Sequence, residues 1–132
     1  MARVCRVLIV EDDPAVQQVF DMVLADKGYE LVLARDGASM RNALGTRDID
    51  VVIIDIMLPG GETGFALARE AGGRGCGVIL VTGHHDQYQG VAESGYRHLF
   101  KPFRLSALTE MVEQVLQDNE AQCHLKSRKL RE

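Results

Sequence analysis

The chain has 132 residues, 46% of them hydrophobic, which is enough for one domain with a buried core. Its net charge of −4 and its pI near 5.5 argue against non-specific binding to nucleic acid. The amino-terminal apolar run, Val7 to Val10, is too short for a signal peptide or a membrane span. We therefore expect one cytoplasmic domain that contacts neither DNA nor the membrane.

Strand-like and helix-like segments alternate along the chain. Runs of β-favouring apolar residues predict strands at 4–10, 30–34, 51–54, 78–81 and 99–100. Apolar residues at helical spacing predict helices after each strand: 14–27, 37–45, a short one around 65–68, a weak one within 84–94, and 105–116. Such alternation implies right-handed βαβ units. We predict a flavodoxin-like, doubly wound, five-stranded parallel sheet of order 2-1-3-4-5 with helices on both faces.

The cysteines and histidines give no pattern typical of a metal site. Cys5, Cys76 and Cys123 are odd in number and lack metal-ligand spacing, so we expect reduced thiols in a cytosolic protein. His84 and His85 are adjacent in a predicted loop, where two neighbours rarely share one ion. We expect their side chains to be solvated.

Acidic residues follow two strands that the predicted order makes neighbours. The first strand ends in Glu11, Asp12 and Asp13, and the third ends in Asp55. Ligands bind at the carboxyl ends of such strands, at the point where the strand order reverses. Converging carboxylates repel one another and require a cation or a proton. Because every ligand is an oxygen, the cluster favours Mg²⁺, Mn²⁺ or Ca²⁺ over zinc.

Lys101 and Thr82 follow the next two strands of the sheet and add a cation and a hydroxyl group. Together with the carboxylates they suit phosphoryl transfer, in which positive charge offsets the phosphoryl oxygens and an aspartate oxygen attacks in line. Each group alone has an ordinary explanation as a turn residue, a helix cap or a solvated charge. Their occurrence together favours a functional site.

Four motifs resemble the receiver domain of two-component response regulators, either a single-domain protein or the receiver of a hybrid histidine kinase. They are Val7–Pro14, Val51–Pro59, Val81–Thr82 and Phe100–Phe103. The resemblance covers residues 4 to 117, and the order and spacing of the motifs are highly specific. We therefore predict a receiver domain over 1–120 and a polar carboxyl-terminal tail over 121–132, with no effector domain.

The resemblance implies a role for each acidic residue. Asp55 is the phosphoacceptor, and its donor is a histidine kinase or a histidine phosphotransfer protein. Asp12 binds Mg²⁺ directly, Glu11 supports the metal through water, and Met57 contributes its backbone carbonyl. Asp13 is expected only to cap the following helix.

The resemblance also implies a switch. Thr82 is the hydroxyl that moves to the phosphoryl group, and Lys101, with a cis bond to Pro102, pairs with that group. The position of the aromatic switch residue falls on His98, which is smaller and more polar than tyrosine.

Three features depart from the family pattern. The turn after Pro59 is one residue longer than usual, as in receivers of hybrid kinases. The segment from Thr82 to Lys101 is short, which predicts a truncated or irregular fourth helix. With His98 at the switch position, we expect phosphorylation to change affinity for a protein partner, not to drive strong homodimerisation.

We interpret the chain as a phosphorylation switch whose only chemistry is its own phosphorylation and dephosphorylation, and so not as an enzyme. One alternative is an aspartyl-phosphate phosphatase of the haloacid dehalogenase type, which needs a second aspartate where this chain has Met57. Another is a receiver-like interaction module that is never phosphorylated. The downstream partner is not identified by the sequence.

Overall fold

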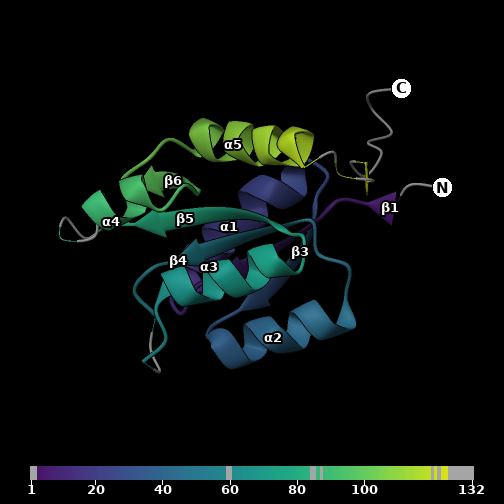
Figure 1. The fold of residues 1–132 in the computed structure, drawn as a ribbon. Coiled ribbons are helices and arrows are strands. Elements are labelled where there is room, and N and C mark those ends of the chain that lie inside the picture. The colour runs from purple at the N-terminus through teal and green to yellow at the C-terminus, as the bar shows by residue number, and fades with distance from the viewer. Residues whose placement is uncertain are drawn as a thin grey trace.

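A five-stranded parallel sheet forms the centre of the computed structural model, which describes residues 3–58, 61–83, 86, 88–119, 121 and 123–124 (Figure 1). The strands are β2 (Arg6–Val10), β3 (Glu30–Ala34), β4 (Val51–Asp55), β5 (Gly77–Thr82) and β6 (Arg97–Phe100). Their order is β3-β2-β4-β5-β6. This confirms the predicted 2-1-3-4-5 topology, because the short strand β1 (Arg3–Val4) precedes the sheet and takes no part in it.

Among the described residues, five helices cover the two faces of the sheet. They are α1 (Pro14–Asp26), α2 (Gly37–Thr46), α3 (Gly64–Gly73), α4 (Tyr88–Glu93) and α5 (Leu105–Asp118). Helices α1 and α5 pack on one face, and α2, α3 and α4 pack on the other. The sheet is therefore the middle of three layers, as Figure 1 shows.

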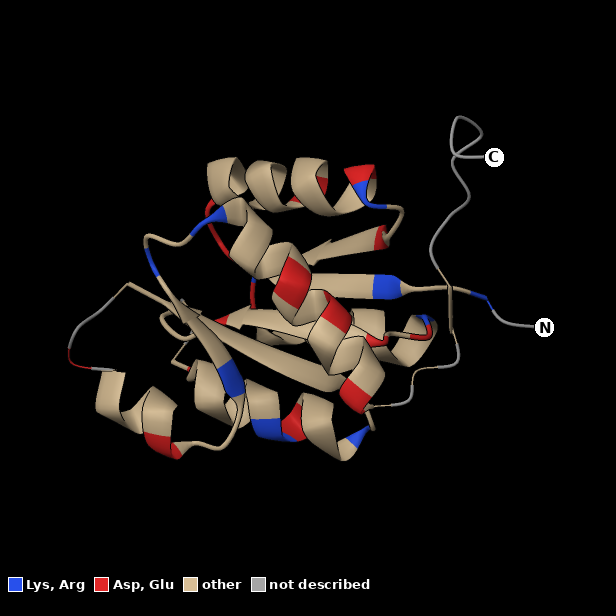
Figure 2. Cartoon of the chain, turned by 90° about the horizontal axis from the view of Figure 1, so that it is seen from above, with Lys and Arg blue, Asp and Glu red and all other residues tan. Residues whose placement is uncertain are grey.

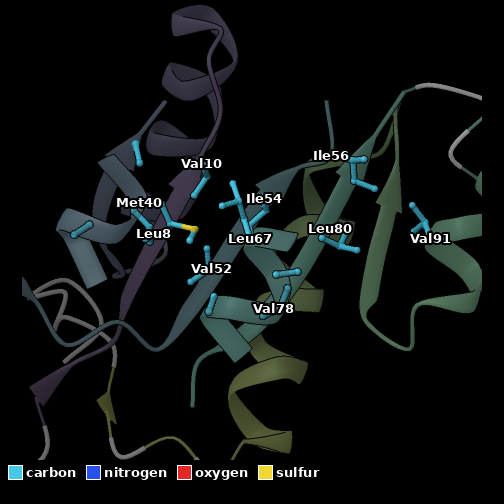
Figure 3. Close-up of a cluster of buried hydrophobic side chains, with 14 residues drawn as sticks. Leu8, Val10, Met40, Val52, Ile54, Ile56, Leu67, Val78, Leu80 and Val91 are labelled. Atoms are coloured by element: carbon cyan, nitrogen blue, oxygen red, sulfur yellow. The ribbon is translucent and has the colours of Figure 1, made fainter. Parts of the chain in front are cut away.

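The central strands are buried on both faces, which explains their unbroken apolar sequences. Alternate residues of β2, β4 and β5 point to opposite sides of the sheet. In Figure 3, Leu8, Val52 and Leu80 lie with Met40 of α2 and Leu67 of α3 on one side. A second buried cluster on the other side joins the same strands to α1 and α5. The two clusters fix the register of the strands.

Polar caps set the beginnings of the helices that follow the strands. The Asp13 side chain accepts a hydrogen bond from Ala15 N, with Pro14 at the first helical position, as predicted. Asp36 and Ser39 form a reciprocal capping box at the start of α2. Gly28, with φ of 97°, follows the end of α1, where the left-handed conformation favours glycine. These caps are readable from sequence.

The fourth helix is short. It has six residues, Tyr88–Glu93, and one buried side chain, Val91. This agrees with the truncation predicted from the short segment between Thr82 and Lys101. The pair His84 and His85, and the Pro59–Gly60 part of the extended turn, lie outside the described residues.

The prediction of three reduced thiols is wrong. Cys5 and Cys123 form a disulfide, and Cys76 is free. The bond joins Cys5, which directly follows the short strand β1 (Arg3–Val4), to Cys123 of the short strand β7 (Cys123–His124). These two strands pair in parallel, and the sequence analysis predicted neither β7 nor this pairing. Figure 1 places both at the end of the sheet opposite the strand arrowheads. Since 118 residues separate the cysteines, no local spacing pattern could reveal their pairing.

The surface carries charges of both signs. Figure 2 shows Lys and Arg positions interspersed with Asp and Glu positions along the described chain. Across that part of the chain, every helix is too short or too polar to traverse a lipid bilayer.

A glycine allows the start of α3 to pack closely against the end of β4. A Cβ atom on Gly64 would lie 2.5 Å from Ile56 Cα and 2.9 Å from the Asp55 carbonyl oxygen. These are backbone atoms, so no side-chain movement relieves the overlap. The chain after Asp55 can pass this closely only because Gly64 has no side chain.

We therefore expect Gly64→Ala to reduce the free energy of unfolding by about 1–3 kcal/mol, as overpacked sites do. Gly45→Ala is the matched control, because a Cβ atom there has no neighbour within 4 Å. That variant should be neutral or more stable by up to about 1 kcal/mol. Urea denaturation measures both, and equal effects would contradict the close packing at Gly64.

Candidate functional site

A cleft of about 360 Å³ opens at the carboxyl edge of the sheet. Its lining residues come from the ends of four strands or the loops that follow them, and from the start of α1: Glu11, Asp12, Asp13, Val16, Asp55, Met57, Gly83 and Lys101. The structure thus brings together the acidic residues and the lysine that the sequence analysis singled out. It does so because β2 and β4 are adjacent, with Val10 opposite Ile54.

Glu11 and Asp55 are held at the end of the sheet by backbone contacts. Glu11 N donates to the Ala34 carbonyl at 2.9 Å, which continues the pairing of β2 with β3. Asp55 is the last residue of β4, and the following Ile56 N donates to the Val81 carbonyl at 3.0 Å. Glu11 and Asp55 are 3% and 9% exposed. Their carboxyl groups therefore have little access to water except through the cleft.

Each oxygen of Asp55 has its own partner. Oδ1 accepts a hydrogen bond from Met57 N at 2.9 Å. Oδ2 lies 3.2 Å from Lys101 Nζ. The two contacts fix the orientation of the carboxylate, because one partner follows it in the chain and the other comes from beyond β6.

Lys101 serves both buried carboxyl groups. Its Nζ is 3.5 Å from Glu11 Oε1 in addition to its contact with Asp55. Its backbone N donates to the Thr82 carbonyl at 2.8 Å, which ties the end of β6 to the end of β5. Burial alone would lower the pKa of Lys101, but the charges of Asp55 and Glu11 outweigh burial and raise it. The side chain is therefore a permanent cation at neutral pH.

Glu11 holds a proton more tightly than an ordinary glutamate. Burial raises its pKa to about 7, and the nearby charge of Asp55 acts in the same direction. The Asp13 backbone N–H, 3.1 Å from Glu11 Oε2, and Lys101 oppose this shift without cancelling it. The cluster thus carries more negative charge than Lys101 alone offsets.

The acidic cluster fits a hard divalent cation. One oxygen each from Glu11, Asp12 and Asp55 lie within 4.8 Å of one another. The donors are all carboxylate oxygens, the ligands that suit Mg²⁺ better than zinc. Asp12 is exposed while the other two are buried, so an ion there would remain open to water on one side. Such openness is typical of Mg²⁺, which keeps several water ligands.

Thr82 and His98 do not line the cleft. Thr82 is fully buried as the last residue of β5, and Gly83 after it reaches the cleft. His98 lies three residues before Lys101 on β6 and opposite Leu80 of β5. Its ring centroid is 5.1 Å from that of Phe100, and Nδ1 lies 3.0 Å from the Tyr96 carbonyl. The Lys101–Pro102 bond is cis, as predicted.

Two supporting residues escaped the sequence analysis. Gln17 of α1 donates through Nε2 to the carbonyls of Glu11, at 2.6 Å, and Ala34, at 3.1 Å, and so holds the acidic loop. Arg41 of α2 binds Glu62, beyond the turn that follows Asp55, and Glu70 of α3. Both residues were polar positions on predicted helices. Only the folded arrangement identifies their partners.

Comparison with known proteins gives a consistent result. A family model for the response regulator receiver domain matches residues 7–113. The chain is 31% identical over 114 residues to the TorCAD operon transcriptional regulatory protein TorR of Escherichia coli K12, covering 83% of this chain and 49% of that protein. The chain thus spans about half the length of the curated relatives it matches.

Solved structures share the fold at similar identity. The signal receiver domain of an HD domain-containing protein from Pseudomonas fluorescens Pf-5 superposes with a TM-score of 0.82 and 26% identity, covering 92% of this chain and 93% of that one. The response regulator TrrA of Thermotoga maritima, solved in complex with Mg²⁺ and BeF, superposes with a TM-score of 0.75 and 26% identity. The match covers 85% of this chain and 99% of that one.

The raised pKa of Glu11 predicts how stability depends on pH without divalent metal. Between its usual 4.5 and about 7, the native protein binds more protons than the unfolded chain, so stability falls as pH rises. Glu11→Gln removes this penalty and keeps an oxygen for Asp13 N–H. Relative to the parent, it should gain on the order of 2 kcal/mol more at pH 8 than at pH 5.

Denaturation in the presence of a chelator at the two pH values measures this difference. Glu110→Gln, on the exposed side of α5, is the control and should show little pH-dependent change. A Glu11→Gln effect that is the same at pH 5 and pH 8 would contradict the raised pKa.

Proposed function

Because the chain belongs to the response regulator receiver family, we propose that it is a phosphorylation switch of a two-component phosphorelay, with Asp55 as phosphoacceptor. The observation that carries the proposal is the Asp55 carboxylate, which lines the cleft between Met57 N–H and Lys101 Nζ. A nucleophile at the carboxyl end of a central strand, beside a lysine and two further acidic groups, is equipped to accept a phosphoryl group.

The protein's contribution to the reaction is positioning and charge. One Asp55 oxygen attacks the phosphorus atom while the bond from phosphorus to the donor nitrogen breaks. The Met57 N–H and Lys101 orient the carboxylate beforehand, which reduces the entropic cost of reaching the attacking geometry. Lys101 then offsets the negative charge of the phosphoryl oxygens.

Mg²⁺ would be held by Asp12, Asp55 and the Met57 carbonyl, with Glu11 in support, and would supply further positive charge to the phosphoryl oxygens. The crowded carboxyl groups and the raised pKa of Glu11 support a metal requirement, because a cation relieves their repulsion. The likeness to TrrA of Thermotoga maritima, which was solved in complex with Mg²⁺ and BeF, supports the same assignment.

Output passes through β5, β6 and α4. Thr82 is buried behind Gly83, and its movement toward a phosphoryl group vacates space on the side where His98 and Phe100 lie. Since α4 has only six residues, the adjoining surface is small. We propose that phosphorylation changes affinity for a protein partner and does not drive strong homodimerisation.

The partners are a histidine kinase or a histidine phosphotransfer protein and an unidentified downstream protein, in the cytoplasm. Figure 2 shows Lys and Arg positions interspersed with Asp and Glu positions, and the chain carries a net charge of −4, so we do not propose direct DNA binding by this domain. The chain acts on no separate substrate. Its chemistry is its own phosphorylation and dephosphorylation.

Acetyl phosphate with Mg²⁺ should add one phosphoryl group to the protein. Asp55→Asn should abolish the adduct, and Asp12→Ala should reduce it strongly because a metal ligand is lost. Asp13→Asn is the matched control, since it is adjacent but serves as a helix cap that asparagine also provides. Intact-mass spectrometry measures all four proteins.

Two results would overturn the proposal. Steady release of phosphate without a stable adduct would indicate a phosphatase of the haloacid dehalogenase type. If the parent protein stays unmodified both with acetyl phosphate and with its kinase, it is a receiver-like interaction module that is never phosphorylated.

The phosphoryl group should be long-lived because Met57 stands beside it. The Met57 side chain is 45% exposed at the cleft and has no group to orient an attacking water. Met57→Asn should therefore dephosphorylate several-fold faster, and Met57→Leu should behave as the parent. Loss of the adduct over time measures the rate. Equal decay in all three proteins would rule out this role for Met57.

A further inference from the structure

The disulfide closes the protein at the edge of the sheet opposite the cleft. Cys5 lies between β1 and β2, and its backbone N donates to the His124 carbonyl at 2.7 Å. Cys123 belongs to β7 and packs against the buried cluster that contains Cys5, Tyr29 and Val51. Strand β7 therefore lies beside the amino-terminal strand β1.

We propose that Cys5 and Cys123 form a reversible thiol–disulfide exchange site, at which a dithiol reductant opens the bond and releases strand β7. In cytosolic proteins disulfides are usually transient and regulatory. The reversibility thus rests on the cytoplasmic location in the proposed function. The site and its chemistry rest on the geometry of the two cysteines.

The two sulfur atoms differ in access, which sets the order of the exchange. Cys5 is 4% exposed, whereas Cys123 is only half-buried. An incoming thiolate attacks Cys123 Sγ, forms a mixed disulfide there, and expels Cys5 as a thiolate that takes up a proton. The second thiol of the reductant then attacks the sulfur atom that the reductant contributed to the mixed disulfide, and this releases Cys123. Two electrons and two protons reach the protein, and the reductant leaves as a disulfide.

The described residues at the amino-terminal side of the bond, from Arg3 to Arg6, are anchored without it. Arg3 binds Asp50 through two hydrogen bonds of 2.7 and 2.8 Å, and Asp50 also accepts from Arg6 N at 2.7 Å. Cys5 is held further by its carbonyl, which accepts from Glu30 N at 2.9 Å. Strand β1 therefore stays in place when the sulfur–sulfur bond opens.

Helix α5 is also seated independently. A Cβ atom on Gly77 would lie 2.2 Å from Val115 Cγ1 and 3.0 Å from Asn119 Nδ2, so the end of α5 fills the space above that glycine. Leu108 and Val112 of the same helix are fully buried in the apolar cluster that joins α1 and α5 to the sheet. In contrast, the described contacts of β7 are its backbone pairing with β1, the hydrogen bond from Cys5 N to the His124 carbonyl, the disulfide and the packing of Cys123. Reduction should free β7 and leave the five-stranded sheet intact.

Cys76 provides an internal control. It is half-buried, donates to the Ile49 carbonyl at 3.4 Å, and forms no disulfide. Burial and the nearby charge of Asp50 raise the pKa of its thiol, which keeps it protonated and a poor competitor in exchange.

The first experiment counts reactive thiols in the whole protein. Purified without reductant, it should give one maleimide adduct in denaturant, at Cys76, and three after treatment with dithiothreitol. A series of reduced-to-oxidised dithiothreitol ratios should convert it smoothly and reversibly between the two forms. Cys76→Ser should give none before reduction and two after it.

The second experiment follows backbone hydrogen exchange in the two forms. Reduction should speed exchange at Cys123 and His124 by about tenfold or more and leave β2 to β6 unchanged. Cys123→Ser should show the fast exchange in both conditions, and acetyl phosphate labelling of Asp55 should persist in it. That persistence separates the exchange site from the proposed phosphorylation function.

Three outcomes would overturn the proposal. The first is the finding of three reactive thiols even at the most oxidising dithiothreitol ratio, which would mean that the bond does not form. Another is equal protection of β7 in both forms, which would mean that the bond fixes nothing. The third is binding of one zinc ion by the reduced protein, lost in Cys123→Ser, which would make Cys5, Asp50 and Cys123 a metal site.

Discussion

Two buried carboxyl groups, Glu11 and Asp55, share one cation, Lys101, at the carboxyl edge of the sheet. Burial makes their repulsion stronger than it would be in water. Lys101 reduces this cost but does not remove it, since the pKa of Glu11 remains at about 7. The native structure thus stores an unfavourable arrangement that a further cation would relieve. The sheet must be stable enough elsewhere to hold these groups together.

That stability comes from the strands that carry the groups. Each of β2, β4 and β5 is buried on both faces, so a shift in register would disturb two apolar clusters at once. The acidic residues follow directly where the apolar runs end. Because Gly64 has no side chain, the start of α3 can lie within contact distance of the backbone at Asp55 and Ile56. Packing of ordinary apolar side chains therefore determines the distances within the charged cluster.

The parts of the molecule that could be predicted from sequence are those with a local signal. The run from Val51 to Asp55 identifies a central strand and its terminal carboxylate, and the Asp13–Pro14 pair identifies the start of α1. The alternation of strands and helices predicts a doubly wound parallel sheet, and five strands fit the common order 2-1-3-4-5. That order alone is enough to bring Glu11 and Asp55 to the ends of neighbouring strands.

Features built from distant residues had no such signal. The Cys5–Cys123 bond depends on two-residue strands too short to show a pattern, and the same is true of the pairing of β1 with β7. Gln17 and Arg41 lie on predicted helices, but their partners come from other elements. The sequence predicts the face of the helix on which such a residue lies. Only the folded structure shows which elements that face contacts.

Strands β1 and β7 pair at one end of the sheet, opposite the strand arrowheads in Figure 1. The residues that line the cleft lie at the other end, where the strands finish. The two ends of the sheet are thus spatially separate. A protein that bound the surface formed by β1 and β7 would leave the entrance to Asp55 unobstructed.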